Sequence, residues 1–175
     1  SRKFQNTRGF IVEGDFFKNV SFSSSFYENQ ARFTEYQSEY YKSVGELYPS
    51  GKGYNAQNAV VNGGARTKPF KTDGFDYAYA FGNVVYKINK KVTLIGGNDQ
   101  HFIGAGYRSL LLSDNSLNSP YVQGKFRISD KFSFVYMRAR MLNLLRRPFT
   151  SSAEAYYEPK AFSTNYLTYK ASDKL

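Results

Sequence analysis

The side chains best suited to catalysis lie around the single histidine of the chain. His101 follows Asp99 by two residues, and Asp114 comes later in the same region. A hydrolytic triad needs a nucleophile oriented by a base and a third group. Ser109 and Ser113 are candidates by residue type, but neither stands in a nucleophile-elbow sequence. The sequence also has no phosphate-binding loop and no metal-ligand spacing. We therefore expect no catalysis, metal or cofactor, and a hydrogen-bonding role for His101.

The same region of the sequence contains residue types that suit sugar binding. Tyr107, Arg108, Asp114 and Asn115 lie close together in the sequence. Aromatic rings present flat apolar faces to pyranose rings, and planar polar groups exchange hydrogen bonds with hydroxyls. The pattern predicts a ligand-facing wall at the outer end of a strand. A second interpretation stays open, in which Arg108 and Asp114 pair with each other and fold the 103–120 connection inward.

The basic residues predict an acidic partner. Arg138 and Arg140 alternate along a predicted strand, where each guanidinium could bind an acidic glycan through two hydrogen bonds. The whole chain carries a formal net charge of +10. Such an excess favours nucleic acid, anionic lipid headgroups or acidic polysaccharide. No nucleic-acid motif is present, so nucleic acid is not expected. The Lys and Arg residues are scattered rather than packed in a tract, which favours the interpretation that the charges lie on solvated turns and lumen walls over a dedicated basic patch.

Strand patterns occur in pairs joined by tight turns. The pairs are 8–17 with 20–28, 75–87 with 92–102, 121–128 with 132–142, and a weaker pair, 152–157 with 161–169, around Glu158-Pro159-Lys160. Longer connections separate the pairs, at 29–74, 103–120 and 143–151. An alternation of short and long connections is typical of outer-membrane barrels.

Several strands have one apolar and one polar face. The apolar sets are Phe10, Val12, Gly14 and Phe16; Val20, Phe22, Ser24 and Phe26; Val122, Gly124, Phe126 and Ile128; and Val135, Met137, Ala139 and Met141. In a membrane barrel these sets should face lipid and the charged sets the lumen, because charge at the bilayer midplane costs about 2–4 kcal/mol. This prediction directs Arg138 and Arg140 into the lumen. A soluble sandwich with one solvated face is the alternative.

Composition agrees with the barrel prediction. Aromatic residues make up 18% of the chain, all of them Tyr and Phe, while mean hydropathy is −0.55. A polar average combined with many aromatic residues suits strands that alternate between lipid and a wet interior. No apolar run approaches the roughly 18 residues of a transmembrane helix. The chain also has no cysteine.

Four stretches resemble a known family. They are His101-Phe-Ile-Gly-Ala-Gly-Tyr-Arg-Ser-Leu-Leu-Leu-Ser-Asp-Asn115, Asn6-Thr-Arg-Gly-Phe10, Ser23-Ser-Ser-Phe-Tyr-Glu-Asn-Gln-Ala-Arg-Phe33 and Asp76-Tyr-Ala-Tyr-Ala-Phe-Gly82. Together they resemble the outer-membrane β-barrel family of the gliding-motility protein RemB and the Wzi-like capsule assembly proteins. The resemblance covers most of residues 6–128. It implies an all-β fold, a transmembrane antiparallel β-barrel, in the bacterial outer membrane.

The topology predicts an interior portion of a larger barrel. If the tight turns are periplasmic, the first strand runs inward, and a further strand is expected before residue 8. The polar tail 170–175 lacks the aromatic end that is expected of a closing strand. We expect one barrel domain over 1–175, with 29–74 as an extracellular loop that carries a short helix near 34–47. A closed eight-stranded barrel is the alternative.

The expected function is non-enzymatic binding or organisation of surface or capsular polysaccharide, in contact with outer-membrane lipid. A scaffold subunit that binds other envelope proteins is the second hypothesis, and an outer-membrane hydrolase the third. The 103–115 loop should fold against the barrel interior. Leu111 would then be buried, Arg108 paired with Asp114, and Tyr107 placed at the barrel mouth.

Overall fold

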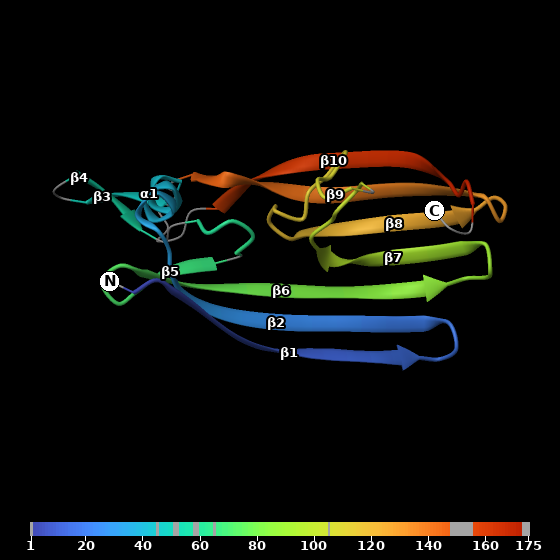
Figure 1. Cartoon of the computed structure of the whole chain (residues 1–175), viewed down its shortest axis with the longest axis horizontal. Coiled ribbons are helices and arrows are strands. Elements are labelled where there is room, and N and C mark those ends of the chain that lie inside the picture. Colours follow the sequence, from blue (N-terminus) through green and yellow to red (C-terminus); the bar gives the residue numbers. More distant parts are fainter. Residues whose placement is uncertain are drawn as a thin grey trace.

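The computed structural model describes residues 2–44, 46–50, 53–57, 60–64, 66–104, 106–147 and 156–172. Most of them belong to one antiparallel sheet with the order β1-β2-β6-β7-β8-β9-β10 (Figure 1). These strands are β1 (Phe4–Phe16), β2 (Val20–Arg32), β6 (Gly74–Lys87), β7 (Val92–Asp99), β8 (Ser119–Arg127), β9 (Phe132–Arg147) and β10 (Tyr156–Tyr169). The predicted all-β, antiparallel class is confirmed.

The sheet is open. In the described residues β1 pairs only with β2, and β10 pairs only with β9, so these two strands form the edges. The alternative of a closed eight-stranded barrel is therefore wrong. Among the same residues no helix is long and apolar enough to cross a membrane.

Tight turns gather at one end of the sheet, on the right in Figure 1. The three predicted hairpins, β1-β2, β6-β7 and β8-β9, are confirmed by the strand pairing. The fourth predicted hairpin is wrong, because β10 runs without a turn past Pro159. Its pairing with β9 shifts register between Tyr157 and Pro159 instead. An edge strand tolerates proline, because the missing N–H is needed only on a side where another strand pairs.

The longest connection is more structured than the sequence predicts. Helix α1 (Glu35–Ser43) lies within the range expected for a helix. The remainder was predicted as loop, but it contains a small hairpin, β3 (Glu46–Ser50) with β4 (Gly53–Gln57), and β5 (Arg66–Phe70), which pairs with β6. All of these lie at the end of the sheet opposite the tight turns (Figure 1).

A small hydrophobic core joins this connection to the sheet. Tyr41 of α1 packs edge-on against Phe75 of β6, with ring centroids 6.0 Å apart, and Phe33 packs edge-on against Tyr41 at 5.1 Å. The backbone N–H of Val60 donates to the carbonyl of Tyr41 over 2.9 Å. Ala31, Val61 and Tyr77 complete the buried cluster. The helix is therefore held by aromatic packing at the far end of one sheet face.

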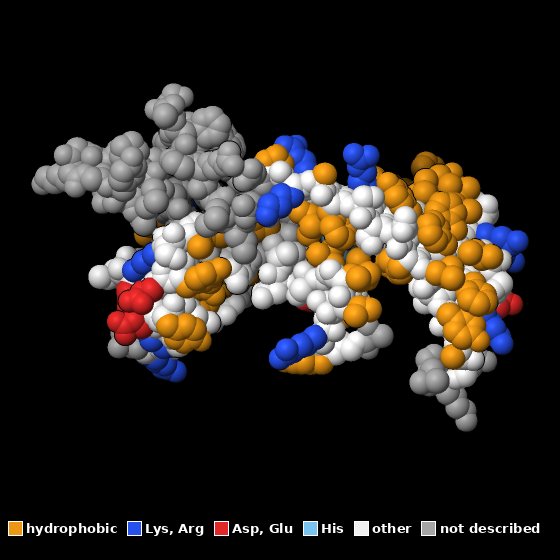
Figure 2. All heavy atoms as spheres, turned by 90° about the horizontal axis from the view of Figure 1, so that it is seen from above, with side chains coloured by type: hydrophobic (Ala, Val, Ile, Leu, Met, Phe, Trp, Pro, Cys, Tyr) orange, Lys and Arg blue, Asp and Glu red, His pale blue; other side chains and the backbone are white. Residues whose placement is uncertain are grey.

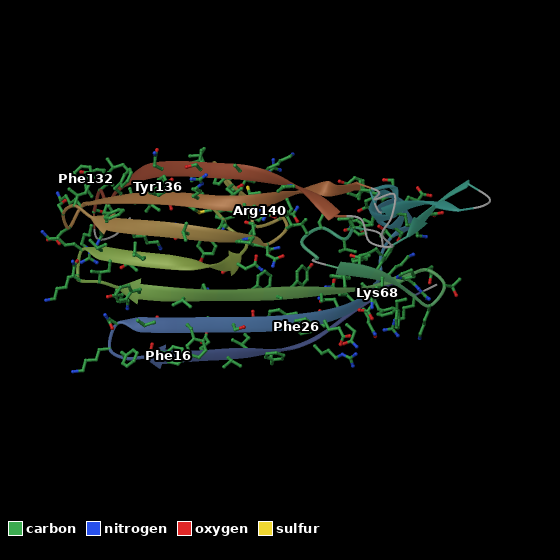
Figure 3. The ribbon with its side chains drawn as sticks, turned by 180° about the vertical axis from the view of Figure 1, so that it is seen from behind. Phe16, Phe26, Lys68, Phe132, Tyr136 and Arg140 are labelled. Carbon is green, nitrogen blue, oxygen red and sulfur yellow. The ribbon has the colours of Figure 1, made fainter. Side chains whose placement is uncertain are left out.

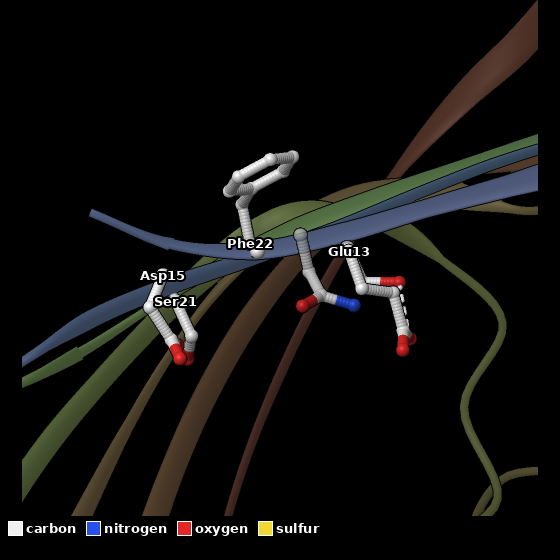
Figure 4. Close-up of a pocket in the computed structure, with 7 residues that line it drawn as sticks. Glu13, Asp15, Ser21 and Phe22 are labelled. Atoms are coloured by element: carbon white, nitrogen blue, oxygen red, sulfur yellow. Dashed lines mark hydrogen bonds between the residues drawn. The ribbon is translucent and has the colours of Figure 1, made fainter.

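The sheet is curved, so its two faces differ. In Figure 4 it bends toward the side on which Glu13, Asp15 and Ser21 point, and the Phe22 ring points the other way. We call these sides the concave and the convex face. Antiparallel partners share a face, and the convex row through Phe22 continues across β6 and β7 with Val84 and Gly96.

The same row shows that the predicted faces of β9 are wrong. Gly96 pairs with Val122, and Val122 pairs with Arg138. Arg138 therefore shares the convex face with the apolar side chains, and Met137, on the alternate face, is concave. Met137 is only 1% exposed. Both faces of β9 carry apolar residues, and the length of the β8-β9 turn decides which set faces which side.

Candidate functional site

A polar groove runs along the concave face. One recess of about 440 Å³ is lined by Glu13, Gly14, Asp15, Ser21, Phe22, Ser23 and Asn83 (Figure 4). A second, of about 380 Å³, is lined by Ser23, Ser25, Tyr27, Phe81, Gly82, Asn83, Asp99, Gln100 and Asp114. The two recesses share Ser23 and Asn83 as lining residues. They form one groove across β1, β2, β6 and β7.

Carboxylates and hydroxyls line the groove because side chains alternate between the two faces along each strand. Glu13 pairs with Ser23, and Asp15 pairs with Ser21, so each carboxylate stands opposite a hydroxyl. The Ser23 hydroxyl donates to Glu13 Oε1 over 3.2 Å, a hydrogen bond drawn in Figure 4. Such a wall offers both acceptors and donors to a polyhydroxylated ligand.

The far end of the groove combines an amide, a carboxylate and aromatic rings. Asn83 Nδ2 lies 3.5 Å from Asp99 Oδ2 and donates to it. The Phe81 ring stacks with Tyr79, with centroids 5.9 Å apart and an interplanar angle of 12°. Carboxylates at Glu13, Asp99 and Asp114 make the groove acidic, although the chain as a whole is strongly basic.

One predicted binding residue, Asp114, lines this groove. The segment that carries it crosses the concave face and is anchored by polar contacts. Gln100 Nε2 donates to the Ser116 carbonyl over 2.7 Å, and Asn118 Nδ2 donates to the Ala80 carbonyl over 2.7 Å. Leu117 is buried beside these contacts. The segment's fixed position therefore depends on residues 116–118, which the sequence did not single out.

The other predicted loop residues lie away from the groove. A bridge between Ile103 and Leu112 closes a small loop, with the Ile103 N–H donating to the Leu112 carbonyl over 2.8 Å. Beyond this bridge Tyr107 is 99% exposed and Leu111 is 55% exposed. Arg108 is also exposed, and no ion pair joins it to a carboxylate in the described residues.

The predicted arrangement of the loop is therefore wrong. Leu111 is not buried, and Arg108 does not pair with Asp114, because the Ile103–Leu112 bridge separates the tip from the anchored segment. Asn115 is exposed as well, and its backbone N–H donates to the Ser113 hydroxyl over 3.2 Å. Asp114 is the member of this predicted set that lines a recess.

Arg138 and Arg140 do not reach the groove either. Both are exposed on the convex face, opposite Ser163 and Ala161 of β10. Figure 3, which shows the molecule from behind, labels Arg140 with Tyr136, Phe16 and Phe26, which the strand register places on this same face. The prediction that these arginines project inward is wrong, because the pairing of Val122 with Arg138 places them on the convex face.

His101 is held by aromatic packing, and the hydrogen bond expected of it is not found at Nε2 in the described residues. Its ring packs edge-on against Tyr121, with centroids 4.2 Å apart. Burial lowers the pKa of His101 below its ordinary value, and the nearby Asp99 carboxylate partly opposes that effect. The His101 Nε2 atom is buried and makes no hydrogen bond within the described part of the chain. In that same part no cluster of His, Asp or Glu side chains could hold a metal ion.

The sequence did contain a signal for the groove. Serines stand at the alternate positions 21, 23 and 25, and acidic residues stand at the alternate positions 13 and 15 of the preceding strand. The tight turn at 17–19 brings these sets together on one face. The contributions of Asn83 and Asp99 could not be found in this way, because they depend on how β6 and β7 join the first hairpin.

Comparison with protein-family models, with curated proteins and with solved structures finds no match to this chain. The functional conclusion therefore depends on the sheet and its two faces.

Proposed function

We propose that this sheet forms part of the wall of an outer-membrane β-barrel that binds surface polysaccharide without catalysing a reaction. The observation that carries the proposal is the position of the exposed apolar side chains. The convex face exposes large apolar side chains, which include Phe10, Val12, Phe16, Val84, Tyr86, Leu94, Val122, Phe126, Tyr136 and Leu167. Exposed apolar patches of this extent mark contact with a membrane or a partner.

The concave face supports the binding part of the proposal. Its groove offers hydroxyls, amides, carboxylates and stacked rings. The carboxylates of Glu13, Asp15 and Asp99 would repel an acidic glycan. The groove therefore fits a neutral or amino-bearing polysaccharide better than the acidic one expected from the net charge.

A binding experiment with the refolded chain in lipid vesicles tests this function. Asn83→Ala combined with Asp99→Asn removes groove contacts, and we expect it to abolish retention of neutral or amino-bearing glycans on a glycan array. Arg138→Ala, on the opposite face, is the control and should retain the wild-type pattern. Equal glycan binding by the groove variant and the wild type would contradict the proposal.

One observation favours a second function, that of a scaffold for other envelope proteins. Arg138 and Arg140 are exposed on the convex face, in a sector of β9 and β10 that has no described acidic side chain on that face. Facing lipid near the midplane, each would cost about 2–4 kcal/mol. An acidic protein partner that covers this sector would remove the cost.

Crosslinking distinguishes the two functions. A photoreactive amino acid at Ser163, which pairs with Arg138, should crosslink to an envelope protein if the scaffold function is correct. The same group at Phe10, on the apolar part of the face, should label only lipid. Lipid-only labelling from both positions would eliminate the scaffold function.

A further inference from the structure

The ends of the strands at the tight turns repeat one pattern. Each turn begins with an exposed large apolar residue and continues to lysine: Phe17 then Lys18, Ile88 then Lys90 and Lys91, Ile128 then Lys131. Strand β10 ends at the same edge with exposed Tyr169, followed by Lys170. Four strand ends distant in sequence therefore place an apolar side chain and a cation side by side.

At this edge the described basic side chains outnumber the acidic ones. Seven exposed basic residues lie in the turns or in the last rows of the strands: Lys18, Lys87, Lys90, Lys91, Lys125, Arg127 and Lys131. Over the same part of the described chain the acidic residues are Asp130 in the third turn and Asp15, next to last in β1. At this end, on the right in Figure 2, hydrophobic side chains gather with Lys and Arg side chains beside them. The opposite end mixes both signs, with acidic side chains drawn in red.

Phe17 supplies an independent observation. Its backbone φ is 62°, a left-handed conformation that is uncommon for non-glycine residues and strained for bulky ones. Its side chain is 88% exposed. A glycine or asparagine would fit this turn with less strain. The described chain covers little of this ring, so the turn presents a large apolar side chain outward.

We propose that this turn rim binds the anionic headgroups of membrane phospholipids. The apolar residues reach the boundary between headgroups and acyl chains, and the lysines contact phosphate just outside it. Aromatic residues gather at that boundary in membrane barrels, and basic clusters next to it attract anionic lipid. The inference rests on the proposed membrane location and adds a lipid preference confined to one end of the barrel.

The test uses the full chain with vesicles of phosphatidylcholine alone and vesicles of equal parts phosphatidylcholine and phosphatidylglycerol. The rim variant carries Lys18→Gln, Lys90→Gln and Lys131→Gln. The control carries Lys3→Gln, Lys42→Gln and Lys68→Gln at the opposite end, with the same change in net charge. Each rim lysine should contribute roughly fivefold to binding of the anionic vesicles at low salt. We expect the rim variant to lose up to about 100-fold, and the control to keep the wild-type preference.

A single-tryptophan reporter keeps the test informative if the triple variant folds poorly. The chain has no tryptophan, so Phe17→Trp reports the rim alone, and Tyr36→Trp on α1 reports the other end. The Phe17→Trp emission should shift to shorter wavelength on insertion, more strongly with phosphatidylglycerol, and Tyr36→Trp should change less.

The outcomes separate the two proposals. Insertion into both kinds of vesicle with no preference for phosphatidylglycerol overturns the rim inference and leaves the membrane function intact. Equal losses in the rim variant and the control variant also overturn it. Failure of the wild-type chain to insert into either vesicle overturns the proposed membrane function, and the rim inference with it.

Discussion

An arginine at position 84 measures directly whether the convex face contacts lipid. Val84 lies on that face of β6, between Phe22 of β2 and Gly96 of β7, and is 49% exposed. The preceding residue, Asn83, points into the concave groove. Val84→Arg and Asn83→Arg therefore add the same side chain to adjacent positions on opposite faces.

The position of Val84 along the strand sets the expected magnitude. Val84 precedes Ile88, the first residue of the tight turn, by four positions. At about 3.4 Å per residue and a strand tilt of about 40°, Val84 lies roughly 10 Å above the rim. The apolar band of a membrane barrel is about 25 Å tall, so this position is close to its midplane.

Arginine at that depth should cost about 2–4 kcal/mol. The folding equilibrium constant would fall roughly 30- to 700-fold, because every 1.4 kcal/mol is tenfold. Asn83→Arg adds its charge beside Asp99, the carboxylate that Asn83 already contacts. Asn83 is half-buried and its hydrogen bond to Asp99 is lost, but the new charge lies next to a carboxylate in a polar groove. We therefore expect a cost of about 1 kcal/mol, the size of one hydrogen bond.

Equilibrium urea titration of the chains refolded into lipid vesicles, followed by far-ultraviolet circular dichroism, gives both free energies of unfolding. Equal stability of the two variants would refute the lipid-contact reasoning. So would a wild-type chain that is folded and monomeric in buffer without detergent, since the convex apolar residues would then be exposed to water.

Three further predictions concern packing and protonation. Met137→Ala should lower the free energy of unfolding by about 2–5 kcal/mol in the same titration, because the side chain is almost completely buried on the concave face. Gly97→Ala should destabilise the sheet by about 1–3 kcal/mol, because a Cβ there would overlap the Gly82 carbonyl oxygen. Gly96→Ala is the control, since the nearest atoms to a Cβ there would be 3.7 Å away. Equal losses of thermal stability in these two variants would contradict the prediction. The pKa of His101 is lowered from its ordinary 6.5 in the folded state, so the unfolded chain binds more protons just below that pH and stability falls as pH drops through it. Hydrogen exchange over residues 100–118 should show faster opening at acid pH, and His101→Gln should remove that dependence.

The sequence predicted the hairpins because their determinants are local. Two or three polar residues between alternating runs specify a turn, and this holds for 18–19, 89–91 and 129–131. The helix within the first long connection also has a local signal, the spacing of Tyr36 and Tyr40. In contrast, Glu158-Pro159-Lys160 resembles a turn but lies within β10, because a strand at the edge of a sheet can accommodate proline.

The candidate site was less predictable, because it draws on strands that are not consecutive. Asn83 comes from β6 and Asp114 from a connection more than 30 positions later. Asp114 was singled out by residue type, but Tyr107 and Arg108 were grouped with it only by proximity in sequence. In the structure the bridge between Ile103 and Leu112 separates Tyr107 and Arg108 from Asp114. A single isolated bridge leaves no periodic pattern in the sequence, so it could not be predicted.

By itself, therefore, the sequence determined the all-β class, the three hairpins and the two-faced pattern of β1 and β2, because each depends on contacts between residues near in the chain. Only the tertiary structure decided the faces of β9. Apolar residues occupy both of its faces, and a shift of one residue in its pairing with β8 exchanges them. The observed pairing places Met137 on the concave face and Arg138 on the convex face, and the same alternation leaves Arg140 on the convex face.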